Sequence, residues 1–133
     1  MPIPIPVTKT KIATVPWGIP ITNEVNRLTT VTTPTAWTNV TAFLNGWVAY
    51  AGLRAPRYRK IGDIVYVEGF VRNGTVGAAA FIMPTGFRSN DSYNIACVSN
   101  SLFGYISVNP DGSIVPQVGA SAWFSLVCQF PTT

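Results

Sequence analysis

DIVYVEGFVR, residues 63–72, is the stretch that decides the fold class of this 133-residue chain. It is rich in β-branched and aromatic residues, which fit the pleated surface of a strand. Successive side chains of a strand point to opposite faces of its sheet. One face of this strand would be small and apolar, and we expect that face to point into a core. It carries Val65, Val67, Gly69 and Val71.

Turn and strand patterns on both sides of this stretch extend the same interpretation. Asn73-Gly74, directly after it, is typical of a two-residue hairpin turn and predicts a return strand over residues 78–83. NPDG, residues 109–112, predicts a second tight turn. Strands are expected at residues 46–50, 57–61, 63–72, 78–83, 93–98, 102–108, 113–118 and 122–130. About eight short strands at regular spacing predict an all-β fold, an antiparallel β-sandwich or jelly roll.

Residues 1–36 differ in composition from residues 37–133 and hold six of the eleven prolines. The alternating Pro-Ile at the start fixes an extended backbone and cannot form the interior of a sheet. We therefore expect an extended arm over residues 1–36, followed by one β domain over residues 37–133. One short helix is predicted in the arm near residues 22–29. Thr22 is a suitable N-cap for it, and Glu24 lies in the first turn, where the helix dipole favours an anion.

The predicted helix has an apolar seam. Ile21, Val25 and Leu28 follow the four-then-three spacing of a coiled coil. A helix of two or three turns is unstable alone, so the seam needs a partner. Either parallel copies from neighbouring subunits bury it, or the helix packs on its own domain. The candidate trimer and anchor contacts of the arm are Ile3, Ile5, Trp17, Ile21, Val25 and Leu28.

The composition restricts the chemistry that the chain can perform. It has no histidine, so triads built on histidine and zinc sites that use it are impossible. A glycosidase needs two facing carboxylates, but Asp63 and Glu68 lie five apart on one predicted strand and would point to opposite faces. Asp91 and Asp111 lie in turn sequences, where the side chain usually bonds the backbone. We therefore expect a protein that is not an enzyme, with no catalytic residue, no cofactor and no metal.

The two cysteines, Cys97 and Cys128, each lie in an apolar stretch. Free cysteine is among the most buried residue types, so both are expected to act as small buried hydrophobes. A disulfide would need adjacent strands with suitable geometry. The paired spacings of zinc-binding cysteines do not occur in the sequence.

Four of the nine cations cluster over residues 54–60, and the chain has a net charge of +4. On a strand, Arg57 and Arg59 share one face and Tyr58 takes the other. A basic strand flanked by aromatics can contact phosphates. The favoured interpretation is that these cations keep a sparsely charged protein soluble or pair across a subunit boundary, with no nucleic-acid partner. No run approaches the roughly 18 apolar residues of a membrane helix, so no membrane insertion is expected.

Four short motifs follow one another along the β domain: NGW (45–47), YRKIGDIVYVEG (58–69), MPTGFR (83–88) and ISVNPDGSI (106–114). Together they resemble a domain found in surface proteins of tailed phages, in minor tail proteins and tail-fibre ends. VPWG (15–18) with ITNEVNRL (21–28) is similar to the start of such proteins in actinobacterial phages. The departures from the family pattern are Met83 for leucine, Phe87 for tyrosine, and Ser89 where proline is frequent.

The resemblance implies a homotrimer on the virion surface, assembled in the host cytoplasm and involved in host attachment. Its partners would be copies of itself, the capsid or tail proteins that hold the arm, and carbohydrate of the host cell surface. Polar loops over residues 71–80, 89–92 and 109–112 are expected to form the adhesive surface. The candidate residues are Asn73, Thr75, Ser89, Asn90, Asp91, Asn109 and Asp111. Tyr93, Tyr105 and Trp123 would either stack on sugars or pack in a core or interface.

Two other functions stay open. The chain could decorate a capsid, as a head-fibre or minor capsid protein anchored by residues 1–36. The lack of a long shaft or collagen-like region in the sequence favours that alternative. More remotely, the chain could be a small polysaccharide depolymerase, against which the missing histidine and the scarce carboxylates count.

Overall fold

The computed structural model describes residues 33–133. The helix predicted near residues 22–29 lies outside the described residues, as do the six candidate arm contacts: Ile3, Ile5, Trp17, Ile21, Val25 and Leu28. Every regular element of the described part is a strand, and the strands form two antiparallel sheets. The all-β, antiparallel fold class predicted from the sequence is therefore confirmed.

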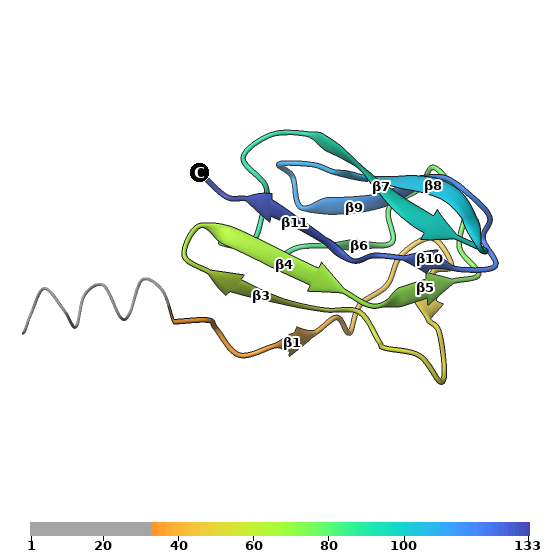
Figure 1. The fold of residues 1–133 in the computed structure, drawn as a ribbon, viewed down its shortest axis with the longest axis horizontal. Helices are drawn as coiled ribbons and strands as arrows, with labels where there is room; N and C mark the ends of the chain where they lie inside the picture. Colours follow the sequence, from red (N-terminus) through yellow and green to blue (C-terminus); the bar gives the residue numbers. More distant parts are fainter. Residues whose placement is uncertain (1–32) are drawn as a thin grey trace, which may run out of the picture. The chain divides into compact units, whose positions relative to one another are not determined.

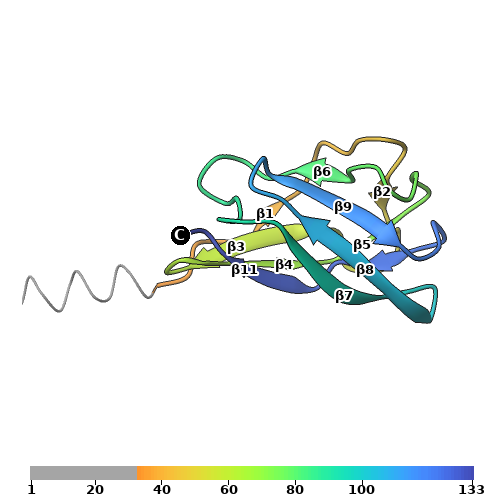
Figure 2. The same cartoon turned by 90° about the horizontal axis from the view of Figure 1, so that it is seen from above.

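One sheet has four strands and the other has seven (Figure 1). The smaller has the order β1-β3-β4-β11, with β1 Thr38–Asn39, β3 Arg57–Ile61, β4 Ile64–Glu68 and β11 Cys128–Pro131. The larger has the order β2-β5-β10-β7-β8-β9-β6. Its strands are β2 Val48–Ala49, β5 Phe70–Arg72, β6 Phe81–Ile82, β7 Tyr93–Ser99, β8 Leu102–Val108, β9 Ser113–Val118 and β10 Phe124–Ser125. Figure 2 shows β7, β8 and β9 side by side, crossing β3 and β4 at an angle.

The core lies between the two sheets and begins with the alternation of residues 64–72. Val65, Val67 and Val71 are fully buried, as predicted for the small apolar face of this stretch. Other elements supply larger side chains, and the largest that are fully buried are Trp47, Phe81, Met83, Phe124 and Phe130. Burying side chains of this size contributes roughly 1.5–3 kcal/mol each, so this core is what holds the sheets together.

Two pairs of strands cross from one sheet to the other at a common corner. β4 pairs with β11 in the four-stranded sheet, and β5 pairs with β10 in the seven-stranded sheet. The register is the same on both sides of the corner, with no residue inserted. At the corner, the amide of Leu126 donates to the carbonyl of Gly69 at 2.8 Å. β4–β5 and β10–β11 thus form one long antiparallel ribbon that bends from sheet to sheet (Figure 1).

This corner divides two strands that the sequence predicted as continuous, at residues 63–72 and 122–130. Gly69 has φ of 130°, and a Cβ there would lie only 2.4 Å from the Cα of Pro56. The chain can make this approach only with glycine. The long β-branched run therefore contains a bend that strand propensity alone does not reveal.

The hairpin predicted at Asn73-Gly74 is wrong. The return segment forms β6, which pairs with β9, whereas β5 pairs with β2 and β10. Asn73 does adopt a left-handed conformation, with φ of 70°. Gly74 serves a close approach, because a Cβ there would lie 1.9 Å from Cδ2 of Trp47. The pair accommodates a core tryptophan instead of reversing a hairpin.

The meander of β7, β8 and β9 follows the sequence prediction closely. β8 and β9 have the predicted bounds, and β7 extends one residue further than predicted, to Ser99. The turn predicted at residues 109–112 is confirmed. The Gly112 amide donates to the Asn109 carbonyl at 2.9 Å, and the Asn109 amide donates to the Ser113 carbonyl at 3.1 Å.

Candidate functional site

A cleft of about 470 Å³ is lined mainly by the four-stranded sheet. Its polar and aromatic lining residues are Trp37, Arg59, Tyr66, Glu68 and Gln129. Cys128 and neighbouring apolar residues complete the lining. The lining of the cleft is therefore mixed, with aromatic, apolar and polar side chains.

Strand register aligns the lining residues in one row. Arg59 of β3 is opposite Tyr66 of β4, and Tyr66 is opposite Gln129 of β11. Trp37 immediately precedes β1, the other neighbour of β3, and its ring lies against Arg59. The row Trp37–Arg59–Tyr66–Gln129 therefore runs across the whole four-stranded sheet. We call these residues the cleft row.

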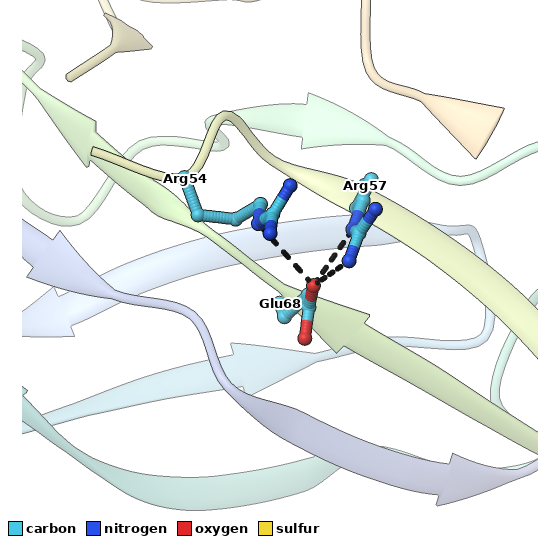
Figure 3. A network of polar contacts seen from close by, with 3 residues as sticks. All are labelled: Arg54, Arg57 and Glu68. Atoms are coloured by element: carbon cyan, nitrogen blue, oxygen red, sulfur yellow. Dashed lines mark hydrogen bonds and ion pairs between the residues drawn. The ribbon is translucent and has the colours of Figure 1, made fainter. Parts of the chain in front are cut away.

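Beside the cleft row, two arginines converge on one carboxylate oxygen (Figure 3). Arg57 Nη2 lies 2.5 Å from Glu68 Oε1, and Arg57 Nε donates to the same oxygen at 2.7 Å. Arg54 Nε lies 3.6 Å from it. Arg57 and Glu68 are opposite one another in the β3–β4 ladder, so strand register creates their contact. One carboxylate thus balances only one of two guanidinium charges.

Arg59 forms no ion pair with any residue that the structure describes. Its Cζ lies 4.5 Å from the centroid of the Trp37 ring, and Arg57 Cζ lies 4.3 Å from the same centroid. Arg59 Nε is buried and has no hydrogen-bond acceptor within residues 33–133. A buried donor without an acceptor costs about 1–3 kcal/mol. The cleft therefore holds a fixed cation with an unused donor.

The two cysteines are free thiols. Burial raises the pKa of Cys128 from 9.0 to about 12, with a smaller contribution from Cys97. Burial also raises the pKa of Cys97, which is half-buried. Thiols with raised pKa stay protonated at neutral pH and are weak nucleophiles. Both side chains pack with the core, as the sequence predicted.

Asp91 and Asp111 serve their own turns, which confirms the sequence prediction. Asp91 Oδ1 accepts a hydrogen bond from the Ser92 amide at 2.7 Å. Asp111 Oδ1 accepts hydrogen bonds from the Ser113 hydroxyl at 2.6 Å and the Ser113 amide at 2.9 Å. These bonds, with a smaller contribution from the charge of Arg88, hold the pKa of Asp111 below its ordinary value. These two carboxylates therefore bond groups of their own turns and do not form a glycosidase-like pair.

The predicted adhesion loops lie at two ends of the seven-stranded sheet. Tyr93 is opposite Val108, which makes the loops at residues 89–92 and 109–112 neighbours at one end. The Asn73 amide donates to the carbonyl of Ser121, just before β10, and β10 pairs with the last residue of β7. The structure therefore brings together Asn90, Asp91, Asn109 and Asp111, and places Asn73 and Thr75 at the other end.

Ser89 contradicts the expectation that it is exposed, because it is only 4% exposed. The adjacent Asn90 amide donates to the Pro131 carbonyl at 3.0 Å, which holds this segment against β11. Asn109 is half-buried, and its Nδ2 donates to Ser113 Oγ. The remaining candidates are exposed: Asn73, Thr75, Asn90, Asp91 and Asp111.

The aromatics considered for sugar stacking are half-buried and do not form one platform. Tyr93 donates from its hydroxyl to Asn90 Oδ1 at 2.7 Å, and its ring packs against the core. Trp123 meets Phe70 edge to face, with centroids 5.8 Å apart. Tyr93 begins β7, whereas the Trp123 carbonyl accepts a hydrogen bond just beyond its end. Packing therefore accounts for the placement of both rings.

The outer face of β7, β8 and β9 is a second candidate surface. These strands have seven, seven and six residues, none of them charged. Phe103 is 69% exposed and lies opposite Val98, which is also exposed. Tyr105, two residues along β8, lies opposite the exposed Val118. We call Val98, Phe103, Tyr105 and Val118 the meander patch.

Sequence reasoning predicted which residues share a face of β3, but not the cleft on that face. It placed Arg57 and Arg59 on one face and Tyr58 on the other, and the Tyr58 ring indeed packs against Phe87 on the opposite side. It missed that Tyr66 and Gln129 lie in one row with Arg59, because the row depends on the pairing of β4 with β3 and of β11 with β4. The alternation of residues 63–72 was a signal that Tyr66 points away from the core.

Within residues 33–133, histidine, cysteine and acidic side chains form no group of three that could hold a metal ion. Nor does this described region contain a helix long and apolar enough to cross a membrane. Among known proteins, no family model matches the chain, and no curated protein or solved structure is significantly similar to it.

Proposed function

We propose that this chain is a non-enzymatic structural protein on the surface of a tailed bacteriophage virion. It would act as a trimeric knob of the minor-tail or tail-fibre kind and take part in host attachment. The motif resemblance over residues 45–114 supports the phage assignment. A chain with no histidine and only five carboxylates supports a role in packing and contact instead of catalysis.

The observation that carries the proposal is the meander patch. Three neighbouring strands without a charged residue present Phe103 and Val98 to solvent. Soluble monomers rarely expose large contiguous apolar surface, and subunit contacts are a common way to cover it. Interface centres are depleted of charge and enriched in aromatic residues, as this patch is. Copies of the patch packed around a three-fold axis would remove it from water.

The polar loops at residues 89–92 and 109–112 support the attachment role. They lie together at one end of the seven-stranded sheet, with Asn90 and Asp91 exposed. Exposed polar loops on a rigid sheet are the usual place for recognition. In the trimer, three such ends would present a repeated surface to the host.

The direct test locates the chain on particles of the phage whose genome encodes it. Antibodies raised against the purified protein should label the tail in electron micrographs. Mass spectrometry against the major capsid protein should count a handful of copies per particle. Label on the head with hundreds of copies would instead establish the capsid-decoration alternative. A particle that lacks the chain would contradict both.

The depolymerase alternative has its own test. Incubation of the purified protein with host-wall polysaccharide should release no reducing sugar. Steady release above a heat-inactivated control would contradict the non-enzymatic role.

A further inference from the structure

The cleft of the four-stranded sheet carries charge that the fold does not use. Arg59 and Glu68 line it, and Arg54 and Arg57 lie beside it with their ion pairs on Glu68. Both ion pairs end on the same Glu68 oxygen, so two cationic charges stay uncompensated among the described residues. A region with this imbalance, set on rigid strands, attracts an anionic group.

Arg59 is the group best placed to receive that anion. Its guanidinium is held against the Trp37 ring, so the side chain is oriented before any ligand arrives. Its buried Nε lacks an acceptor within the described part of the chain. Guanidinium presents its donors in a planar fork that matches carboxylate and phosphate oxygens. An oxyanion bound there would supply the missing acceptor.

The other members of the cleft row suit a hydroxylated ligand. Neither the Tyr66 hydroxyl nor the side-chain amide of Gln129 hydrogen-bonds to another side chain or backbone group of residues 33–133. They lie beside Arg59 in consecutive strands of the sheet. A hydroxyl and an amide both donate and accept, which is what sugar hydroxyl groups require. The cleft volume also falls in the roughly 300–1,000 Å³ range of small-molecule sites.

We propose that the cleft binds a carbohydrate that carries an oxyanion, either a uronate carboxylate or a sugar phosphate. The oxyanion binds Arg59, and sugar hydroxyl groups bind Tyr66 and Gln129. The inference rests on the proposed function, since it names the class of surface carbohydrate that attachment would use. It also places that contact in the cleft instead of at the polar loops.

Charge argues against two other occupants. The arm, residues 1–36, contains three cations and only one carboxylate, so a cationic cleft repels it. A nucleic acid carries a phosphate at every nucleotide, whereas Arg59 is the one arginine among the described residues that line the cleft. A single oxyanion with neutral hydroxyl groups around it matches that one cation.

The experiment measures binding of defined probes to the full chain by calorimetry at low ionic strength, where such contacts are least screened. The probes are digalacturonate, its neutral disaccharide counterpart, glucose 6-phosphate, inorganic phosphate and a single-stranded DNA oligomer. We expect digalacturonate or glucose 6-phosphate to bind at least tenfold more tightly than the neutral disaccharide and inorganic phosphate. Which of the two binds identifies the oxyanion.

Variants test the residues. Arg59→Gln should weaken binding roughly tenfold or more, as the loss of a charge-assisted hydrogen bond predicts. Arg72→Gln removes the same charge from an arginine that also stacks on an aromatic ring, Tyr50, outside the cleft, and should leave binding within twofold. Gln129→Ala changes an exposed side chain, keeps the fold intact, and should weaken binding of the sugar but not of inorganic phosphate.

Several results would overturn the inference: equal binding of the neutral disaccharide, no binding of either acidic sugar, preference for DNA, or an unchanged affinity in both Arg59→Gln and Gln129→Ala. These outcomes are separable from failure of the proposed function. A chain located on the virion that ignores acidic sugars overturns the cleft alone. A chain that binds them through Arg59 but is absent from particles overturns the phage role alone.

Discussion

Asp111 stabilises its own turn through Oδ1, which accepts hydrogen bonds from the hydroxyl and the amide of Ser113. The turn joins β8 to β9 and is closed by the Gly112 amide on the Asn109 carbonyl. An exposed carboxylate can therefore have a structural task. For a single residue such as Asp111, its hydrogen-bond partners, and not its exposure, decide whether its side chain is available to a ligand.

We predict that acid weakens the fold partly through Asp111. Its folded pKa lies below the ordinary value of 3.8, so its contribution is fully present above that value and is lost as the pH falls through the lowered folded pKa. Asp111→Asn should be less stable than the wild type at neutral pH. Its unfolding midpoint in urea should also change less between neutral and strongly acidic solution. Identical acid profiles for the two proteins would contradict this assignment.

The contribution of Cys128 to stability depends on pH in the opposite direction. Its pKa rises from 9.0 to about 12 on folding, so the folded state keeps a proton that the unfolded state releases above pH 9. Stability should therefore fall between pH 9 and pH 12, by up to about 1.4 kcal/mol per pH unit from this group.

Cys128→Ala provides the comparison for that alkaline loss. It should be less stable at pH 7, by about 1 kcal/mol for a small cavity, but its urea midpoint should decline less steeply above pH 9. All other titratable groups are common to both proteins, so only the difference between the two slopes reports on Cys128. Parallel slopes would show that the thiol does not carry the effect.

Among the elements, the ribbon of β4–β5 and β10–β11 does most to define the architecture. It belongs to both sheets, and its single register continues through the corner at Gly69. The corner needs a backbone that lies against Pro56 and a φ that side chains other than glycine rarely adopt. Any side chain there would clash with the backbone of Ala55 and Pro56.

We predict that Gly69→Ala destabilises the protein by about 2–4 kcal/mol, because positive φ and a backbone clash add together. Gly77→Ala is the matched control. Gly77 also has positive φ, 92°, but open space where its Cβ would stand. Gly77→Ala should lower the free energy of unfolding by only about 1–2 kcal/mol, which is the strain of a left-handed residue with a Cβ. Equal losses of unfolding free energy would show that the clash with Pro56 is unimportant.

Local patterns predicted those elements whose partners are close in sequence. β8, β9 and the turn at residues 109–112 follow from alternation and turn chemistry, which act over a few residues. The pairing of β6 with β9 and the corner at Gly69 depend on neighbours far along the chain. Asn73-Gly74 was misread for the same reason, since Trp47 is what requires that glycine.

On the scale of the whole molecule, the two sheets present different outer faces. The four-stranded sheet presents the cleft row with its excess of positive charge, and the seven-stranded sheet presents the uncharged meander patch. The sequence predicted that Arg57 and Arg59 share a face, but the cleft itself needs β11 beside β4. Separate faces would allow the proposed self-association and the proposed ligand binding to occur together.

We predict that the wild type has a solution mass close to three times 14.3 kDa and that Phe103→Glu converts it to the monomer. A buried charge without a partner is costly, whereas Phe103 is exposed in one copy, so the variant should still fold. Leu53→Glu makes the same change at an exposed residue outside the meander patch and should stay trimeric. Light scattering at micromolar concentration measures both. A monomeric wild type would contradict the proposed assembly.

The ribbon also sets the order in which the chain can fold. Its partners lie 53 residues apart at Val71 and Phe124 and 67 apart at Ile64 and Pro131, whereas those of β7 and β8 are at most 15 apart. Long loops close at a higher entropic cost and more slowly. The meander can thus form during synthesis, while the ribbon must wait until residues through Pro131 have left the ribosome. We therefore expect the ribbon, which joins the two sheets, to close after the meander has formed.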